Sequence, residues 1–169
     1  MELKEIKSAL NAFGKYVIQQ ARTNLTKGRR NVRGDLYKSL NYDLDKVSKG
    51  YKIYFEMEDY GMYQDRGVKG TKSGRSLSGF SFKKSSNLVG LEYHTGIFSE
   101  WARFRRLQPR DKKGRFGSYK TMGFILARSI KEKGIKPSLF FTKPFEAGLK
   151  RLPPELEKAL RKDIEQNIA

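Results

Sequence analysis

Apolar and polar side chains alternate between Tyr51 and Met57, and this is the clearest pattern in the chain. One face of the run carries Tyr51, Ile53, Phe55 and Met57, and the other carries Lys52, Tyr54, Glu56 and Glu58. A period of two predicts a half-buried β-strand. A second alternating run, Leu36 to Leu44, precedes it across the polar, glycine-containing linker Asp45 to Gly50. The two runs are therefore expected to form an antiparallel hairpin.

A helical period governs the N-terminal part of the chain. Between Glu2 and Leu25 the apolar residues recur every three or four positions, at Leu3, Ile6, Leu10, Phe13, Val17, Ala21 and Leu25. This spacing predicts an amphipathic helix. The helix should end near Lys27 and Gly28, because a basic last turn and a following glycine both favour a helix C-terminus. Gly14 lies inside it and costs about 1 kcal/mol relative to alanine, so a close neighbour is expected there.

Two further helices are predicted towards the C-terminus. One helix face carries Met122, Ile125, Leu126, Ser129 and Ile130, and this helix should end at Gly134. After an extended segment, Ile135 to Phe141, Thr142 is expected to cap a last helix with Pro144 in its first turn. The pair Pro153-Pro154 should kink or break that helix. Beyond the pair an apolar stripe continues through Leu156, Leu160, Ile164 and Ile168.

Together these elements predict an α+β fold, in which an antiparallel sheet packs against an N-terminal and a C-terminal amphipathic helix. A length of 169 residues suits a single domain, residues 1–169. After the central strand, Asp59 to Gly67 should form one helical turn that ends at Gly67. The pattern then changes, and residues 68–120 are interpreted as a long, basic, partly flexible insertion or assembly arm.

Several short patterns follow one another within this insertion. Lys69 to Ser86 is dominated by Gly, Ser, Lys and Arg, and we expect a partner to order it. Leu88 to Tyr93 is interpreted as a short strand, Ile97 to Leu107 has helix-like spacing, and Gln108 to Ser118 is a basic, turn-rich loop. The helix-like stretch places aromatic residues among arginines, at Phe98, Trp101 and Phe104. We interpret these aromatics as protein-interface or satellite-core residues in preference to base-stacking residues.

Charge is distributed unevenly along the chain. Lys and Arg number 36 and Asp and Glu 18, which gives a formal net charge of +18, and Arg66 to Lys136 alone contains 18 basic and 4 acidic residues. This concentration indicates a polyanionic partner, either nucleic acid or an acidic protein surface, with a solvated surface as the alternative. The candidate contacts to phosphate or to an acidic surface are Arg103, Arg105, Arg106, Arg110, Lys112, Lys113 and Arg115.

Residue types that carry catalysis or bind metals are scarce. The chain has no cysteine and one histidine, His94, which excludes disulfides, thiolate metal sites and Cys/His pairs. Residues 67–74 contain glycines and lysines without the spacing of a phosphate-binding loop. The carboxylates that could hold magnesium are Glu56, Glu58, Asp59 and Asp65. We expect them to pair with Lys and Arg instead, and therefore expect no metal, cofactor or enzymatic activity.

The sequence also bears on location. Its apolar runs are only a few residues long, so no membrane span or membrane partner is expected. The N-terminus lacks the charged, then apolar, then small-residue order of a signal peptide. Together with the lack of cysteine, this indicates synthesis and use in a cytoplasm.

Four features follow one another along the chain. They are the N-terminal helix, a Gly-x-Leu-x-x-Ser-Leu segment at Gly34 to Leu40, a strand followed by Tyr60-x-x-Tyr63 and a tail from Gly67 to Thr71, and Lys143-Pro144-Phe145 before the last helix. In this order they resemble the tail-completion or neck proteins of tailed bacteriophages. The resemblance covers Glu2 to Thr71 and Ile135 to Ala169, and the basic middle lies outside it.

Two motifs depart from the usual pattern of that family. The family usually has Tyr-Ala-x-Tyr-x-Glu-x-Gly-Thr, whereas this chain has Gly61 for alanine, Asp65 for glutamate, and threonine only at Thr71. The usual Pro-Phe-x-x-Pro-Ala is represented by Pro144 to Gly148 without the second proline. Carried over position by position, the structural motif residues are Tyr60, Tyr63, Gly67, Thr71, Pro144 and Phe145.

The resemblance implies a non-enzymatic structural protein of the virion neck or tail, made in the cytoplasm of the bacterial host. Such a protein forms a homo-oligomeric ring, expected to be a hexamer, that joins the head connector to the tail and lets the genome pass through. Its implied partners are further copies of itself, other phage neck, connector and tail proteins, and genomic DNA in the channel. The competing hypothesis is a sequence-independent nucleic-acid-binding protein that uses the basic middle region.

Overall fold

A computed structural model describes residues 3–30, 33–48, 50–72, 79–82 and 89–168. The chain divides into two compact units. The first comprises Met1–Gly61 and Leu139–Ala169, and the second comprises Met62–Ser138. The segment predicted as an insertion, residues 68–120, falls inside the second unit, which also contains the helix that follows it. Each unit is described by itself below.

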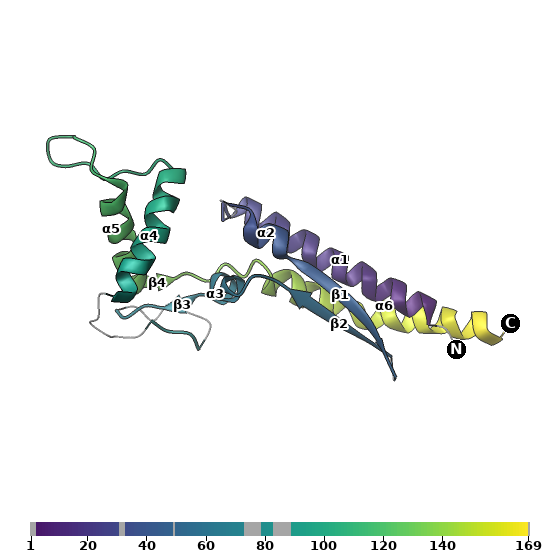
Figure 1. Cartoon of the computed structure of the whole chain (residues 1–169). Helices are drawn as coiled ribbons and strands as arrows, with labels where there is room; N and C mark the ends of the chain where they lie inside the picture. Colours follow the sequence, from purple (N-terminus) through teal and green to yellow (C-terminus); the bar gives the residue numbers. More distant parts are fainter. Residues whose placement is uncertain (1–2, 31–32, 49, 73–78, 83–88, 169) are drawn as a thin grey trace. The chain divides into compact units, whose positions relative to one another are not determined.

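The first unit is the predicted α+β core. Its elements are α1 (Lys4–Lys27), α2 (Asp35–Ser39), β1 (Asn41–Val47), β2 (Gly50–Glu56) and α6 (Thr142–Ile168), and the boundary with the second unit falls within α3 (Tyr60–Arg66). Strands β1 and β2 form an antiparallel hairpin in which Val47 pairs with Gly50. Helices α1 and α6 lie side by side, and the hairpin runs along them (Figure 1). The fold class expected from the sequence is confirmed.

The start of the hairpin differs from the sequence prediction. Residues 36–39 lie in α2, and only the chain from Asn41 onwards is a strand. The short helix begins after Gly34, which has a left-handed backbone conformation with φ 84°, and the Lys38 amide donates to the Gly34 carbonyl oxygen. Leu36 and Leu40 are both buried. A spacing of four residues places two side chains on one face in a helix and in a strand alike, so the pattern did not distinguish the two.

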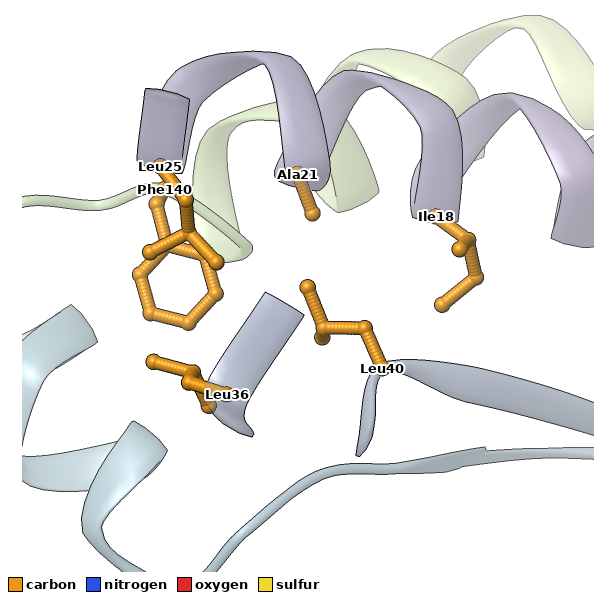
Figure 2. Packing of buried hydrophobic residues seen from close by; sticks show 6 residues of the cluster. All are labelled: Ile18, Ala21, Leu25, Leu36, Leu40 and Phe140. Atoms are coloured by element: carbon orange, nitrogen blue, oxygen red, sulfur yellow. The ribbon is translucent and has the colours of Figure 1, made fainter. Parts of the chain in front are cut away.

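Two hydrophobic clusters hold the first unit together. One gathers side chains from α1, α2 and the segment before α6, namely Ile18, Ala21, Leu25, Leu36, Leu40 and Phe140 (Figure 2). The other is centred on Phe13, Val17 and Leu152 and extends to the inward face of β2. On that face Ile53 and Phe55 are partly buried, whereas Tyr54 on the opposite face is exposed, so the predicted alternation of the strand is confirmed.

An unforeseen polar contact joins the ends of the two long helices. Asp163 of α6 is fully buried, and its carboxylate accepts hydrogen bonds from the backbone amides of Glu5 (2.9 Å) and Ile6 (3.0 Å). These amides belong to the first turn of α1, where no residue within the helix can accept from them. Leu3, at the N-cap position, makes no side-chain capping bond. The carboxylate from α6 therefore performs the role that a capping side chain usually performs from within the same segment.

The ends of α1 and α6 correct two details of the prediction. Helix α1 ends at Lys27 as expected, but the left-handed residue is Arg29 (φ 52°) and not Gly28 (φ −73°). The amides of Arg29 and Arg30 donate to the carbonyls of Thr26 and Leu25, as in a Schellman motif. Helix α6 continues through the exposed pair Pro153-Pro154 without a break.

The second unit contains a pair of helices, α4 (Val89–Phe104) and α5 (Tyr119–Lys133), which lie against each other (Figure 1). Residues 89–93 were predicted as a strand, but they are helical. Helix α4 begins eight residues before Ile97, where the helical pattern in the sequence starts. Leu88, the first residue of the predicted strand, lies outside the described residues. Two short strands, β3 (Val68–Lys69) and β4 (Gly134–Ile135), pair in antiparallel fashion. Helix α5 ends at Gly134 as predicted, with φ 82° at that residue. Within the described ranges, no helix is long and apolar enough to cross a membrane.

Candidate functional site

The helix pair of the second unit positions the basic residues singled out in the sequence. Small residues lie between the helices: Ala102 of α4 and Gly123 and Ala127 of α5 are all buried, which allows the two backbones to approach closely. Ser118 caps α5 by accepting from the Thr121 amide at 3.0 Å. The connection between the helices therefore starts and ends at fixed points, and it carries most of the candidate cationic contacts.

A tight hairpin loop, which we call the basic finger (Arg110–Phe116), forms the tip of this connection. Arg110 and Phe116 pair as an antiparallel bridge, and the Gly117 amide donates to the Pro109 carbonyl at 2.8 Å. Inside the finger one carboxylate oxygen of Asp111 accepts from the amides of Lys113 and Arg115, and the other accepts from Arg115 Nε, each at 2.9 Å. Asp111 thus holds the loop in one conformation from within.

The hydrogen bonds donated by the Arg115 backbone and guanidinium, and then by the Lys113 backbone, lower the pKa of Asp111 below its ordinary value. The carboxylate is therefore ionised over the whole physiological range. Its negative charge interacts with the Lys113 and Arg115 amides and with the Arg115 guanidinium of the same loop. Around it, the four basic residues of the finger, Arg110, Lys112, Lys113 and Arg115, are exposed.

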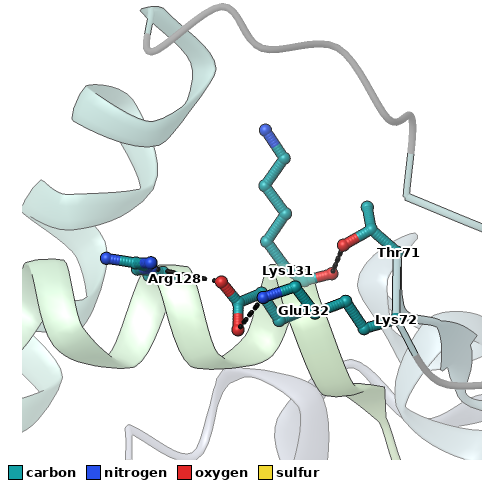
Figure 3. Close-up of polar contacts among 5 residues, drawn as sticks. All are labelled: Thr71, Lys72, Arg128, Lys131 and Glu132. Carbon is teal, nitrogen blue, oxygen red and sulfur yellow. Dashed lines mark hydrogen bonds and ion pairs between the residues drawn. The ribbon is translucent and has the colours of Figure 1, made fainter.

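A second carboxylate is engaged in a similar way at the end of α5. Glu132 lies between Arg128 Nε (3.1 Å) and Lys72 Nζ (3.2 Å), and hydrogen bonds from Arg128 and then Lys72 lower its pKa (Figure 3). By sequence the second unit carries 18 basic and 5 acidic residues, a net charge of +13. Of the acidic residues of this unit, Asp65 is buried, and Asp111 and Glu132 form ion pairs with basic residues of the same unit.

The arginines near the finger also contact aromatic rings. The guanidinium carbon lies 5.6 Å from the ring centroid of Trp101 for Arg105, 5.8 Å from that of Tyr119 for Arg103, and 4.4 Å from that of Phe116 for Arg110. Phe98 and Trp101 of α4 are partly buried, whereas Phe104 is 65 % exposed. Of the three aromatics predicted as interface or satellite-core residues, Phe104 is therefore the one most accessible to a partner.

The motif residues of the first unit have structural surroundings. Phe145 packs against the rings of Phe13 (5.9 Å) and Phe55 (5.7 Å), which joins α6 to α1 and to the sheet. Pro144 is buried in the first turn of α6. Tyr60 is 46 % exposed. Burial, followed by the nearby Asp35 carboxylate, raises the pKa of its phenol, and a hydrogen bond with the Leu36 backbone opposes the shift.

In the second unit the motif residues fix the chain that enters β3. Gly67 has φ 79°, and a Cβ there would lie 2.5 Å from the Ile135 carbonyl oxygen, so only glycine fits this position. The Thr71 amide and hydroxyl both donate to the Lys131 carbonyl, at 3.0 and 3.3 Å (Figure 3). Tyr63 contacts Phe80 with 4.8 Å between ring centroids. Tyr63 is 42 % exposed, and the tyrosine whose ring packs against α1 is Tyr42 of β1.

The predicted flexible arm is partly outside the described residues, at 73–78 and 83–88. Its described part is hydrogen bonded: Lys69 donates to Phe80, Phe82 donates to Lys69, and Lys72 donates to Glu132 through their backbones. The expectation that a partner orders Lys69 to Ser86 stays a prediction. The carbonyls at the C-terminal end of α5 accept from this segment, since they have no partner inside the helix.

The candidate magnesium carboxylates do not form a metal-binding group. Glu56, Glu58 and Asp59 are exposed, whereas Asp65 is buried. Among the described residues, no group of three or more His, Asp or Glu side chains is arranged to hold an ion. His94 lies within α4.

Sequence reasoning missed the organising role of Asp111. The signal was present, because Asp111-Lys-Lys-Gly114 has aspartate at the first and glycine at the fourth position of a type I turn, and the Gly114 amide donates to the Asp111 carbonyl at 3.0 Å. Asp163 gave no comparable signal, because the amides that it binds are more than 150 positions away in the sequence.

No protein-family model matches the chain, and no curated protein or solved structure is significantly similar to it.

Proposed function

We propose that this chain is a structural protein of the phage neck or tail, which forms a ring that joins the head connector to the tail and lets the genome pass. The observation that carries the proposal is the order of elements along the chain. An N-terminal helix, a hairpin, a short helix bearing Tyr60 and Tyr63, and a last helix opening with Lys143-Pro144-Phe145 follow one another, as the family resemblance implies. Gly67, Thr71, Pro144 and Phe145 are packing or backbone-fixing residues, which agrees with a structural role.

Exposed apolar side chains on the last helix support assembly. Leu149, Leu160, Ile164 and Ile168 of α6 are exposed, although the same helix already buries Leu152 and Ala159. A helix that is apolar beyond the face buried in its own subunit is typical of a chain with further protein contacts. In a closed ring each subunit presents one surface to the next, and this stripe is a candidate for one of the two surfaces.

The size of the purified protein tests the proposal. Light scattering after size exclusion and native mass spectrometry should give one discrete assembly, expected to be a hexamer, and electron micrographs should show rings. Replacing Leu160 and Ile164 together with glutamate should shift the assembly to monomers without loss of helical circular dichroism. Replacing the exposed charged residues Lys158 and Glu165 with alanine is the matched control and should leave the ring intact. A monomer at all concentrations would contradict the proposal.

The competing function is that of a monomeric, sequence-independent nucleic-acid-binding protein. The specific observation in its favour is the net charge of +13 on the second unit. The two functions differ in the expected oligomeric state. A neck protein should form a ring without DNA, whereas a nucleic-acid-binding protein should be a monomer whose DNA affinity depends strongly on salt.

A further inference from the structure

We infer that the basic finger (Arg110–Phe116) is a preformed contact for the phosphate backbone of duplex DNA. This inference rests on the proposed function for the source of the DNA, the genome that would pass through the ring. It adds the place on the subunit where that DNA is held. The contact is independent of base sequence, because Lys and Arg side chains bind phosphate oxygens without reading base edges.

The arrangement of charge in the finger favours an external anion. Its single carboxylate, Asp111, accepts three hydrogen bonds from the loop, although its side chain is exposed. Lys112 and Lys113 are exposed at the turn that this carboxylate closes. Arg110 contacts the Phe116 ring, and an aromatic face does not neutralise a guanidinium charge. Arg115 forms an ion pair with Asp111, so the charge that the finger presents to a partner is that of Arg110, Lys112 and Lys113.

The finger is also ordered before any partner binds. The Asp111 amide donates to the Arg115 carbonyl, and this bond, the Pro109–Gly117 bond and the Asp111 side-chain bonds fix both strands and the turn of the loop. A loop held in its bound conformation loses less conformational entropy on binding than a mobile basic tail does. The finger thus differs from a basic loop that is merely solvated, because such a loop would not need an internal carboxylate to fix its conformation.

The residue types favour DNA over an acidic protein surface. Lysine is depleted in protein–protein interfaces, where arginine and aromatic residues predominate, whereas DNA interfaces are strongly positive and use lysine freely on phosphates. Two adjacent lysines lie at the tip, and Arg103, Arg105 and Arg106 lie at the base of the connection, in a unit with a net charge of +13. Duplex DNA is the polyanion with the charge density to match this surface.

Fluorescence anisotropy with a labelled 20-base-pair duplex of mixed sequence tests the inference between 50 and 200 mM salt. The Lys112→Ala/Lys113→Ala variant should bind about tenfold more weakly at 100 mM salt, and the slope of log Kd against log salt should fall by about 2. The matched control is Lys150→Ala/Lys158→Ala, which removes the same charge from exposed positions of α6 and should change Kd by less than about twofold. Equal effects of the two pairs, or no duplex binding by the wild type, would overturn the inference.

Asp111→Ala separates a preformed finger from bulk charge. This change makes the protein more positive, yet it should weaken duplex binding because the loop loses its internal acceptor; tighter binding would contradict the inference. Poly-glutamate of equal total charge should compete poorly with the duplex, and equal competition would assign the finger to an acidic protein surface instead. Light scattering on each variant reports the ring separately. An intact ring with no finger-dependent DNA binding contradicts this inference alone, and DNA binding by a monomer contradicts the neck function alone.

Discussion

Gly14 in the middle of α1 lies directly beneath the ring of Tyr42 in β1. A Cβ at position 14 would overlap three carbon atoms of that ring. The glycine therefore lets the helix and the hairpin approach more closely than any other residue would. This is the close neighbour that the sequence predicted from a glycine inside an amphipathic helix.

We predict that Gly14→Ala destabilises the protein, although alanine favours a helix by about 1 kcal/mol over glycine. Forcing a methyl group into this contact should cost about 1–3 kcal/mol, so the overpacking outweighs the propensity. Urea unfolding followed by circular dichroism measures the difference. In a Tyr42→Ala background, where the ring is gone, the same Gly14→Ala change should become stabilising. A stabilising effect in the wild-type background would show that the helix and hairpin are further apart than described.

Asp163 leads to a second prediction. Asp163→Ala should lower the free energy of unfolding by about 1–3 kcal/mol, because two amides in the first turn of α1 lose their acceptor while the site stays closed. Asp163→Asn keeps one acceptor oxygen and should cost less. Glu165→Ala, at an exposed position of the same helix, is the control and should stay within about 0.5 kcal/mol of the wild type. If Asp163→Ala matched that control, the cap would contribute nothing to stability.

The two faces of β2 allow a paired test of the core. Phe55→Asp should unfold the first unit, at a cost above about 3 kcal/mol, because a charge would replace a ring that contacts Phe13, Phe141 and Phe145. Tyr54→Asp makes a similar change one residue earlier, where the side chain is 45 % exposed, and should leave the thermal unfolding midpoint within a few degrees of the wild type. The opposite ranking of the two variants would mean that the faces of the strand are reversed.

The strand and the long helices could be predicted because each has an apolar period that extends over several turns or pairs. The boundaries failed where the period was ambiguous or short. Leu36 and Leu40 fit helix and strand equally well, and residues 89–93 are too few to show a helical period by themselves. The C-terminal end of α1 shows a third limit. Glycine is the residue that most readily adopts the left-handed conformation, so Gly28 was the expected cap, but the neighbouring Arg29 adopts that conformation instead.

The candidate site was predicted in composition but not in structure. Counting charges located the basic segment and named the cations of the finger, since charge is readable from sequence alone. The conformation of the finger depends on hydrogen bonds from one aspartate to amides two and four residues later. A count of net charge treats that aspartate as a reduction of the positive surface, whereas in the structure it organises that surface.

The last prediction concerns the pH dependence of the basic finger. The pKa of Asp111 is lowered in the folded loop, so its carboxylate stabilises the loop at any pH above the ordinary value of about 4, and this contribution is lost as the pH falls through the lowered folded value. In two-dimensional NMR spectra the amide signals of Lys113 and Arg115 should therefore shift together, with a midpoint below about 4. In Asp111→Asn, which has no ionisable group at this position, both signals should already differ from the wild type at pH 7 and should not titrate in this range. A midpoint above 4 in the wild type would mean that the hydrogen bonds from Arg115 and Lys113 do not form in solution, and the finger would then lack the internal support from which its DNA contact was inferred.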